Sequence, residues 1–196
     1  MRTGKLAPLI KQFYPEYYIW EKYEERTCIP FKSVDGEYGI LGNFAPTPLI
    51  VNGIEFVNAE QLFQICKFKD REILEKIHKS RGLSIKMYAK SAETKGFRRG
   101  DWGNIVVDVM KYCIKTKYDQ SSKFRETLIS TKGYNIVEDQ TRKNNRSGDT
   151  WGAVLQNGEY VGSNLMGRLL MELRDSDGLL KYTLPDDILD YIQILK

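Results

Sequence analysis

The stretch Asn58-Ala-Glu-Gln-Leu-Phe-Gln-Ile-Cys-Lys67 predicts a helix whose surface is sharply divided. At about 100° per residue, the side chains of Glu60, Gln64 and Lys67 fall on one narrow stripe. Phe63 flanks this stripe, and the opposite side of the helix is apolar. A carboxylate, an amide and an ammonium framed by apolar surface are typical of the wall of a polar pocket. Taken alone, the pattern also fits an ordinary amphipathic helix with polar pairs three and four residues apart.

Two capping signals mark the start of this helix. Asn58 is a favoured N-cap residue, and Gln61, three residues later, is placed to complete a capping box. Glu60 then lies in the first helical turn, where the helix dipole favours an ionised carboxylate. The sequence therefore predicts a charged carboxylate at a defined place near the beginning of the helix.

Hydrophobic periodicity and turn signals predict the other elements. Helices are expected over 59–70, 71–79, 84–93, 102–118, 122–130 and 163–174, and from Pro185 onward, with Asp101 and Ser163 as caps. Strands are expected over 27–32, 49–56 with a turn at Asn52-Gly53, 134–138, and 151–161 as a hairpin around Asn157-Gly158. The predicted fold class is α+β, a single helix-rich domain with a small antiparallel sheet.

The bulk composition limits the domain organisation. The chain has 196 residues, 41% hydrophobic and 29% charged, which suits one globular domain. We expect an aromatic-rich N-terminal extension over 1–25 that packs across the domain, a catalytic domain over 26–175 and a C-terminal helical extension over 176–196. No apolar run approaches the roughly 20 residues of a membrane span, and no secretory signal is evident. Three widely spaced cysteines indicate reduced core residues, so a cytoplasmic protein without a membrane partner is expected.

The titratable residues favour carboxylate chemistry. The single histidine, His78, argues against a His-rich zinc site, and we interpret it as a surface or helix-end residue. The net charge is +4. Basic residues cluster as Lys86/Lys90/Lys95/Arg98/Arg99 and as Arg142/Lys143/Arg146. Each cluster is either a solvated surface or a receiver of phosphates from a small substrate or a nucleic acid.

Four segments in order resemble the NADAR family. They are Tyr38-Gly-Ile-Leu-Gly-Asn-Phe44; Ala59-Glu-Gln-Leu-Phe-Gln-Ile-Cys-Lys-Phe68; Arg99-Gly-Asp-Trp102; and Thr150-Trp-Gly152 followed by Gly162-Ser-Asn-Leu-Met-Gly-Arg-Leu-Leu-Met-Glu-Leu-Arg174. Order and spacing agree from about Phe31 to Arg174. Gln61 stands where the family usually has histidine and Gly42 where it has serine, and the expected acidic residue before Trp-Gly is displaced to Asp149.

The resemblance implies an N-glycosidase that cleaves the C1′–N bond between a phosphorylated ribose and a base, through an oxocarbenium-like sugar. Glu60 is the expected catalytic carboxylate, and Asp149 is a candidate second acid. The expected substrate-binding residues are Asn43, Phe44, Gln64, Lys67, Trp102, Trp151, Gly152 and Asn164. Backbone N–H groups at Gly162 and Ser163, with Arg168, are candidates for phosphate binding. No metal or redox cofactor is implied.

Two substrate classes follow from the resemblance. One is ADP-ribose on guanine in nucleic acid, removed as an antitoxin to an ADP-ribosyltransferase toxin, and the other is a phosphoribosylamino-pyrimidine of riboflavin synthesis. The basic loop 142–146, the aromatic extension and the replacement of histidine by Gln61 favour the first. A non-catalytic module that binds ADP-ribose or a nucleotide is a further alternative. Glu60 argues against it, because a carboxylate adds little to the binding of an anionic ligand.

Overall fold

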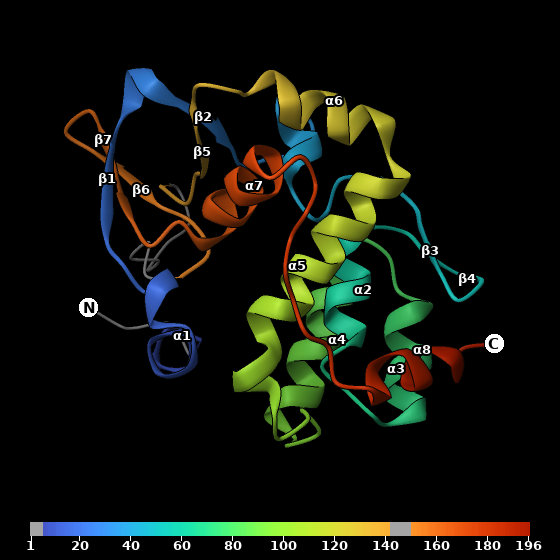
Figure 1. The fold of residues 1–196 in the computed structure, drawn as a ribbon. Coiled ribbons are helices and arrows are strands. Elements are labelled where there is room, and N and C mark those ends of the chain that lie inside the picture. The colour runs from blue at the N-terminus through green and yellow to red at the C-terminus, as the bar shows by residue number, and fades with distance from the viewer. Residues whose placement is uncertain (1–5, 142–149) are drawn as a thin grey trace. The chain divides into compact units, whose positions relative to one another are not determined.

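The computed structural model describes residues 6–141 and 150–196 (Figure 1). The described chain forms two compact units, each assembled from two segments. The first unit draws on Met1–Gly42 and Ser122–Leu180, and the second on Asn43–Ser121 and Lys181–Lys196. Each unit therefore combines segments that are far apart in the sequence.

The first unit holds two small sheets and three helices. Strands β1 (Glu21–Glu24), β7 (Glu159–Gly162) and β6 (Val154–Gln156) form an antiparallel sheet in that order, and β2 (Cys28–Phe31) runs parallel to β5 (Asn135–Glu138). The helices are α1 (Ala7–Phe13), α6 (Ser122–Ser130) and α7 (Leu165–Asp175). Helix α7 packs against β5, as Figure 1 shows. The core of the first unit includes Tyr23, Val137, Ala153 and Tyr160.

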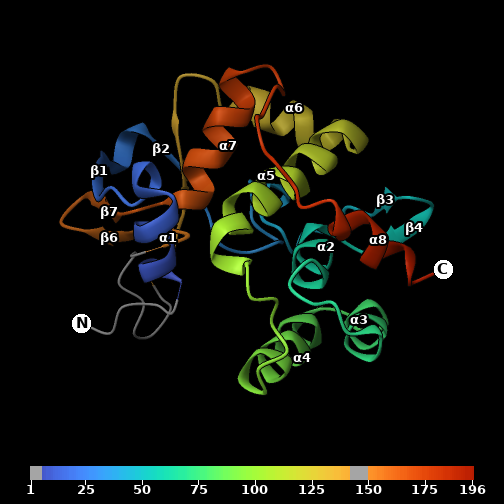
Figure 2. The same ribbon diagram turned by 60° about the horizontal axis from the view of Figure 1, so that its bottom comes forward.

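The second unit is helical apart from one hairpin. Strands β3 (Leu49–Val51) and β4 (Ile54–Phe56) form the hairpin. The helices are α2 (Ala59–Ile65), α3 (Arg71–His78), α4 (Leu83–Thr94), α5 (Trp102–Gln120) and α8 (Asp187–Gln193). Helix α2 packs against α3, α4 and α5, which lie around it in Figure 2. The best-marked helix of the sequence is thus the central one of this unit.

The predicted α+β class is confirmed, and both predicted hairpins form. Their turns have left-handed backbone at Asn52 and Gly53 and again at Asn157 and Gly158, which asparagine and glycine tolerate best. The strands are spread over three small sheets, and one of these, β2 with β5, is a parallel pair. Local sequence does not show that pairing, because the two strands are about a hundred residues apart.

Helix α2 is shorter than predicted. It ends at Ile65, whereas periodicity extended it to residue 70. The amide N–H groups of Lys67 and Phe68 bond to carbonyls three residues back, and Phe68 forms a β-bridge with Arg98. Asp70 caps α3 by accepting a hydrogen bond from the Ile73 N–H at 3.0 Å. The bridge and the new cap compete successfully with helix continuation.

Two predicted side-chain caps are wrong. Asp101 occupies the N-cap position of α5, but its carboxylate bonds to Arg99 instead of to a helix amide. Asn164, not Ser163, stands at the N-cap of α7, with a left-handed φ of 44°. The Asp101 carboxylate is taken by Arg99, two residues back, and the side chain of Asn164 bonds to β5 instead of capping α7.

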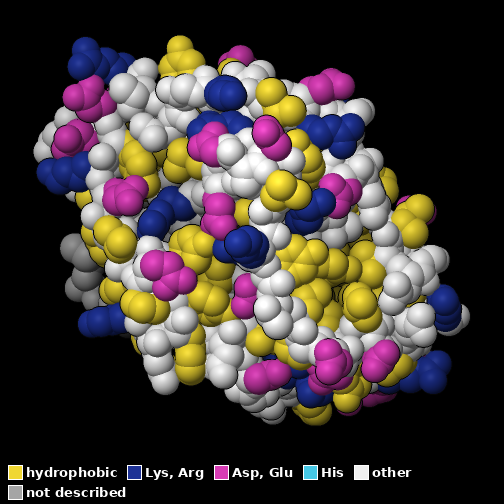
Figure 3. All heavy atoms as spheres, in the orientation of Figure 1, with side chains coloured by type: hydrophobic (Ala, Val, Ile, Leu, Met, Phe, Trp, Pro, Cys, Tyr) yellow, Lys and Arg dark blue, Asp and Glu magenta, His cyan; other side chains and the backbone are white. Residues whose placement is uncertain are grey.

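The N-terminal segment of the first unit contacts β7 and α7. Strand β1 pairs with β7, and the Tyr17 hydroxyl donates to Glu172 on α7 at 2.7 Å. The boundaries proposed for the two extensions stay predictions. Within residues 6–141 and 150–196, no helix combines the length and hydropathy that crossing a bilayer requires. On the face shown in Figure 3, acidic and basic side chains are interspersed.

Candidate active site

The candidate site is built on the buried helix α2 of the second unit. All seven residues of this helix are buried, and Glu60 is 4% exposed. Asn58 caps the helix by accepting a hydrogen bond from the Gln61 N–H at 3.0 Å, as predicted. The Glu60 N–H donates to the carbonyl of Asn43 at 3.0 Å. This bond joins two of the motif segments, so the helix start and the loop before β3 are held together.

The Glu60 carboxylate has two polar partners. Gln64, one turn along α2, donates from Nε2 to Oε1 at 2.7 Å. Lys86, on α4, places its Nζ 3.4 Å from the same oxygen. The Lys86 ammonium also lies over the ring of Phe44, 4.6 Å from its centroid. A buried carboxylate is costly unless it is paired and hydrogen-bonded, and these contacts supply both.

Lys67 lies just beyond the end of α2 and pairs with a carboxylate of α4. Its Nζ is 2.9 Å from Glu93 Oε1 and lies over the rings of Phe63 and Trp102 at 5.2 and 5.5 Å. Burial lowers the pKa of the Lys67 ammonium, and the carboxylates of Glu93 and then Glu60 oppose that change. Lys67 is thus a largely buried cation near Glu60 whose charge is paired with Glu93 and covered by two aromatic rings.

Trp102 does not present a free stacking surface. It is 2% exposed and meets Phe63 edge-on, with ring centroids 5.3 Å apart. The expectation that Trp102 contacts the substrate therefore conflicts with its burial in the core. Asn43 and Phe44 are half-buried, and Asn43 Nδ2 lies 3.2 Å from Met110 Sδ.

Gln61 points away from the site. Its Oε1 accepts from the Val57 N–H at 2.9 Å, so it does not close the predicted capping box onto Asn58. Its Nε2 donates to the carbonyls of Ile77, His78 and Ser80 at 2.9–3.1 Å. Gln61 therefore anchors α2 to the end of α3. The substitution of glutamine for the family's histidine thus changes this structural contact and not a contact to the substrate.

The amides that follow the predicted phosphate-binding pair Gly162 and Ser163 are already bonded. The N–H groups of Asn164, Leu165 and Met166 donate to the carbonyls of residues 152, 150 and 151 at 2.8–3.1 Å. The segment 150–152 supplies these acceptors, so the amides after Ser163 are not free, and the role of the Gly162 and Ser163 N–H groups stays a prediction. Ser163 is buried, and its Oγ has no hydrogen-bond partner among the described residues.

The other motif residues of this unit hold α7 against β5. Asn164 donates from Nδ2 to the Ile136 carbonyl at 2.8 Å and accepts from the Glu138 N–H at 3.1 Å. A Cβ added at Gly152 would lie 2.2 Å from the Glu138 carbonyl oxygen, and one at Gly167 would lie 2.1 Å from that of Ile136. These positions need glycine because two backbones approach closely there.

The remaining predicted residues of the first unit are engaged elsewhere or not described. Arg168 donates from Nη2 to the Glu16 carbonyl at 3.0 Å and lies over the Tyr17 ring, while its Nη1 is buried without a partner among the described residues. Trp151 is half-buried, and Gly162 is buried. The candidate acid Asp149 and the basic loop 142–146 lie outside the described residues.

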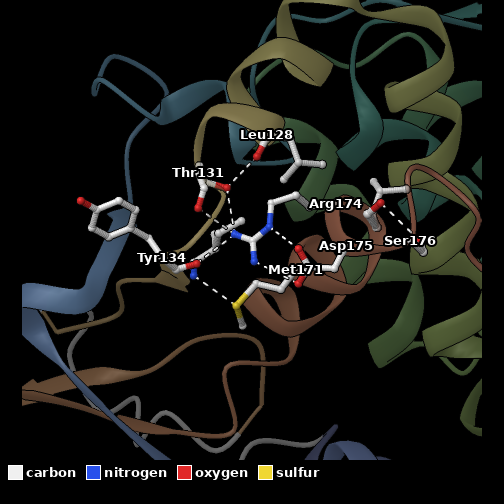
Figure 4. A network of polar contacts seen from close by, with 9 residues as sticks. Leu128, Thr131, Tyr134, Met171, Arg174, Asp175 and Ser176 are labelled. Atoms are coloured by element: carbon white, nitrogen blue, oxygen red, sulfur yellow. Dashed lines mark hydrogen bonds and ion pairs between the residues drawn. The ribbon is translucent and has the colours of Figure 1, made fainter.

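Arg174, at the end of α7, forms a buried structural network (Figure 4). Its guanidinium donates to the carbonyls of Thr131 and Tyr134, each at 2.9 Å, and to both carboxylate oxygens of Asp175. This network ties α7 to the turn between α6 and β5. Arg174 therefore holds α7 in place, and its guanidinium nitrogens are hydrogen-bonded to protein acceptors.

Comparison with known proteins follows the motif segments closely. The model of the NADAR domain matches residues 30–176. The chain belongs to the NADAR family. It is 30% identical to N-glycosidase YbiA of Escherichia coli K12 over 149 residues, which are 76% of this chain and 88% of YbiA. The NMR structure of E. coli YbiA superposes with a TM-score of 0.62 at 29% identity, covering 76% of this chain and 84% of that one.

Two longer NADAR relatives carry another name. A riboflavin biosynthesis protein of Vibrio vulnificus is 29% identical over 147 residues, 75% of this chain and 38% of that protein. The chloroplastic riboflavin biosynthesis protein PYRR of Zea mays is 29% identical over 164 residues, 76% of this chain and 25% of that protein.

Sequence reasoning on this NADAR chain missed two residues of the second-unit site. Lys86 and Glu93 both come from α4 and contact Glu60 and Lys67 respectively. Lys86 was noted only as part of a basic cluster, since nothing in its local sequence indicates that α4 packs against α2. Among the described residues, no group of His, Cys, Asp and Glu is arranged to hold a metal ion.

Proposed function

We propose that this NADAR protein is a hydrolase of N-glycosyl bonds, with Glu60 as its catalytic carboxylate. The observation that carries the proposal is the buried Glu60 carboxylate, bonded to Gln64 and paired with Lys86 on a family motif. The name of the relative YbiA, an N-glycosidase, supports the same reaction class. Breaking a C1′–N bond develops positive charge on the ribose, and a fixed carboxylate stabilises that charge.

The reaction balances with water as the only co-reactant. The C1′–N bond breaks, its electron pair leaves with nitrogen, and the water oxygen forms the new bond to C1′. Glu60 takes the proton of this water as general base, and the departing nitrogen gains a proton. The products are a free phosphorylated ribose and the released base. Gln64 bonds to the Glu60 carboxylate and the Asn43 carbonyl accepts from the Glu60 N–H, and we assign both residues to the ribose hydroxyls.

The finer proposal is that the substrate is ADP-ribose attached to guanine in nucleic acid, with an ADP-ribosyltransferase toxin as the cognate partner. Its remaining support is the basic sequence of loop 142–146, which suits a phosphate backbone. The Gln61 replacement no longer bears on substrate choice, because Gln61 anchors α2. Tyr17 is engaged in packing, although Trp20 remains 45% exposed.

A second candidate substrate is favoured by the names of the longer relatives. Two of them are riboflavin biosynthesis proteins. This candidate is a phosphoribosylamino-pyrimidine, which also joins a phosphorylated ribose to nitrogen. The same carboxylate chemistry serves both substrates, so the choice between them depends on binding outside the reacting centre.

A paired turnover assay tests these proposals. Wild type, Glu60→Gln and the control Glu72→Gln, an exposed carboxylate on α3, are each given an oligonucleotide carrying ADP-ribosylated guanine or the pyrimidine intermediate. Release of ADP-ribose and intact guanine, lost only in Glu60→Gln, supports the finer proposal. Turnover of the pyrimidine alone supports the second candidate. If wild type binds ADP-ribose and turns over neither substrate, the enzyme proposal is wrong and the binding-module interpretation replaces it.

A further inference from the structure

The two oxygens of the Glu60 carboxylate are held unequally. Gln64 Nε2 and Lys86 Nζ both contact Oε1, at 2.7 and 3.4 Å. Among the described residues, none donates a hydrogen bond to Oε2. A carboxylate fixed through one oxygen keeps the lone pairs of the other for a water or a developing cation.

The Lys86 ammonium is held on two sides, although half of the side chain is exposed. Its side chain is 51% exposed, whereas that of Glu60 is 6% exposed. The Phe44 ring lies beneath the ammonium at 4.6 Å, a cation–π contact that restricts where it can go. A surface ion pair between two mobile side chains contributes little, but here one partner is buried and the other rests on a ring.

Gln64 also supplies an unused acceptor beside the same carboxylate. Its Nε2 must face Glu60 because a carboxylate accepts and does not donate. Its Oε1 is buried and has no hydrogen-bond partner among the described residues. A buried polar atom without a partner is rare in proteins and indicates a place where a ligand donor fits. Glu60 Oε2 and Gln64 Oε1 are therefore both available to accept hydrogen bonds from a ligand.

We propose that Lys86 is a positioning residue of this site. It holds Oε1 of Glu60 together with Gln64, so that Oε2 is the oxygen that meets the attacking water and the developing positive charge. This inference rests on the proposed function for its chemistry. The Lys86–Glu60 contact itself does not depend on which substrate is cleaved.

Kinetics of Lys86 variants test the proposal on whichever substrate wild type turns over. Lys86→Met lowers kcat by about 10- to 100-fold, because a misdirected reacting group costs up to about that much, while KM changes less than about twofold. Lys86→Arg restores part of the loss. Lys90→Met, which removes an exposed lysine one turn along α4, is the control and leaves both constants unchanged. An unchanged kcat in Lys86→Met, or a rise in KM alone, overturns the proposal.

A measurement without turnover separates this inference from the proposed function. The side-chain carboxyl carbon of Glu60 is observed by NMR at neutral pH and assigned by its disappearance in Glu60→Gln. Its resonance moves in Lys86→Met, because the adjacent charge is lost, and stays in place in Lys90→Met. An unmoved resonance in Lys86→Met overturns the positioning role. If wild type turns over neither substrate while the resonance moves as expected, the proposed function fails and the positioning of Glu60 stands.

Discussion

The Glu60 site in the second unit and the α7–β5 contact in the first unit both come from NADAR motif segments, yet their polar groups are used differently. Around Glu60, a buried carboxylate and a buried amide keep acceptor atoms that no residue in the described part of the chain donates to. At the start of α7, both Oδ1 and Nδ2 of Asn164 are hydrogen-bonded to the backbone of β5, and the neighbouring N–H groups are bonded to carbonyls. The first arrangement leaves capacity for a substrate. In the second these backbone amides and Asn164 leave none, and among the buried side-chain atoms described there only Ser163 Oγ and Arg168 Nη1 lack a partner.

This difference teaches that a motif match does not by itself separate chemistry from architecture. Gly152 and Gly167 belong to the motif because any larger residue would collide with β5. Glu60 belongs to it without such a steric reason, and its buried charge is compensated through Oε1 by Gln64 and Lys86, which leaves Oε2 open. The sorting criterion is therefore whether the polar groups of a motif residue are already satisfied within the fold.

The largest expected effect is on the chemical step in Glu60→Gln. Turnover falls by about 10²- to 10⁴-fold, because the variant cannot act as a base or carry negative charge. The free energy of unfolding changes by less than about 1 kcal/mol, since Gln64 still finds an acceptor at position 60. Steady-state kinetics and urea unfolding measure the two quantities. A large loss of stability at unchanged turnover of the folded protein would break the comparison.

Gly167→Ala tests the architectural side. We expect the free energy of unfolding to fall by about 3 kcal/mol, because the new Cβ meets the Ile136 carbonyl oxygen and the Asn164 amide. Urea unfolding measures the change. Gly100→Ala is the control, since no atom lies within 4 Å of its added Cβ, and its stability stays within about 0.5 kcal/mol of wild type. Equal stability of the two variants would contradict the close-approach argument.

Asn164→Ala tests whether a predicted ligand residue is structural. The variant leaves the Ile136 carbonyl and the Glu138 N–H without partners and places alanine in left-handed backbone, which together cost about 2 kcal/mol. Asn164→Gly removes the same bonds without the backbone strain and so costs less. Unfolding curves and KM are measured for both. A raised KM at unchanged stability would make Asn164 a substrate contact and break the comparison.

Lys117 sharpens the comparison through pH, because it is a buried cation of α5 outside the Glu60 contacts. Burial lowers its pKa from 10.5 to about 7 in the folded protein. Between pH 7 and 10.5 the unfolded chain therefore binds more protons at this residue, so the free energy of unfolding rises with pH, by at most about 1.4 kcal/mol per pH unit. Lys117→Met removes this rise, as unfolding at pH 7, 8 and 9 will show. An unaltered slope would contradict the burial effect.

Local chemistry was enough to predict several elements and part of the site. The Asn58 cap and the Asn52-Gly53 and Asn157-Gly158 turns follow from residue types at fixed offsets. The Glu60–Gln64 bond follows from their spacing of four residues on one helix. The end of α2 does not follow from local residue types, because the Phe68–Arg98 bridge joins residues thirty positions apart.

Short-range preferences thus specify the hairpins, most of the helices and the polar stripe of α2, since each depends on residues within a few positions of one another. Packing between distant segments specifies everything that depends on a partner. It pairs β2 with β5, turns Gln61 toward α3, occupies the amides at the start of α7 and brings Lys86 to Glu60. The physical reason is that a buried polar group takes the best available partner, and the fold decides which partners are within reach.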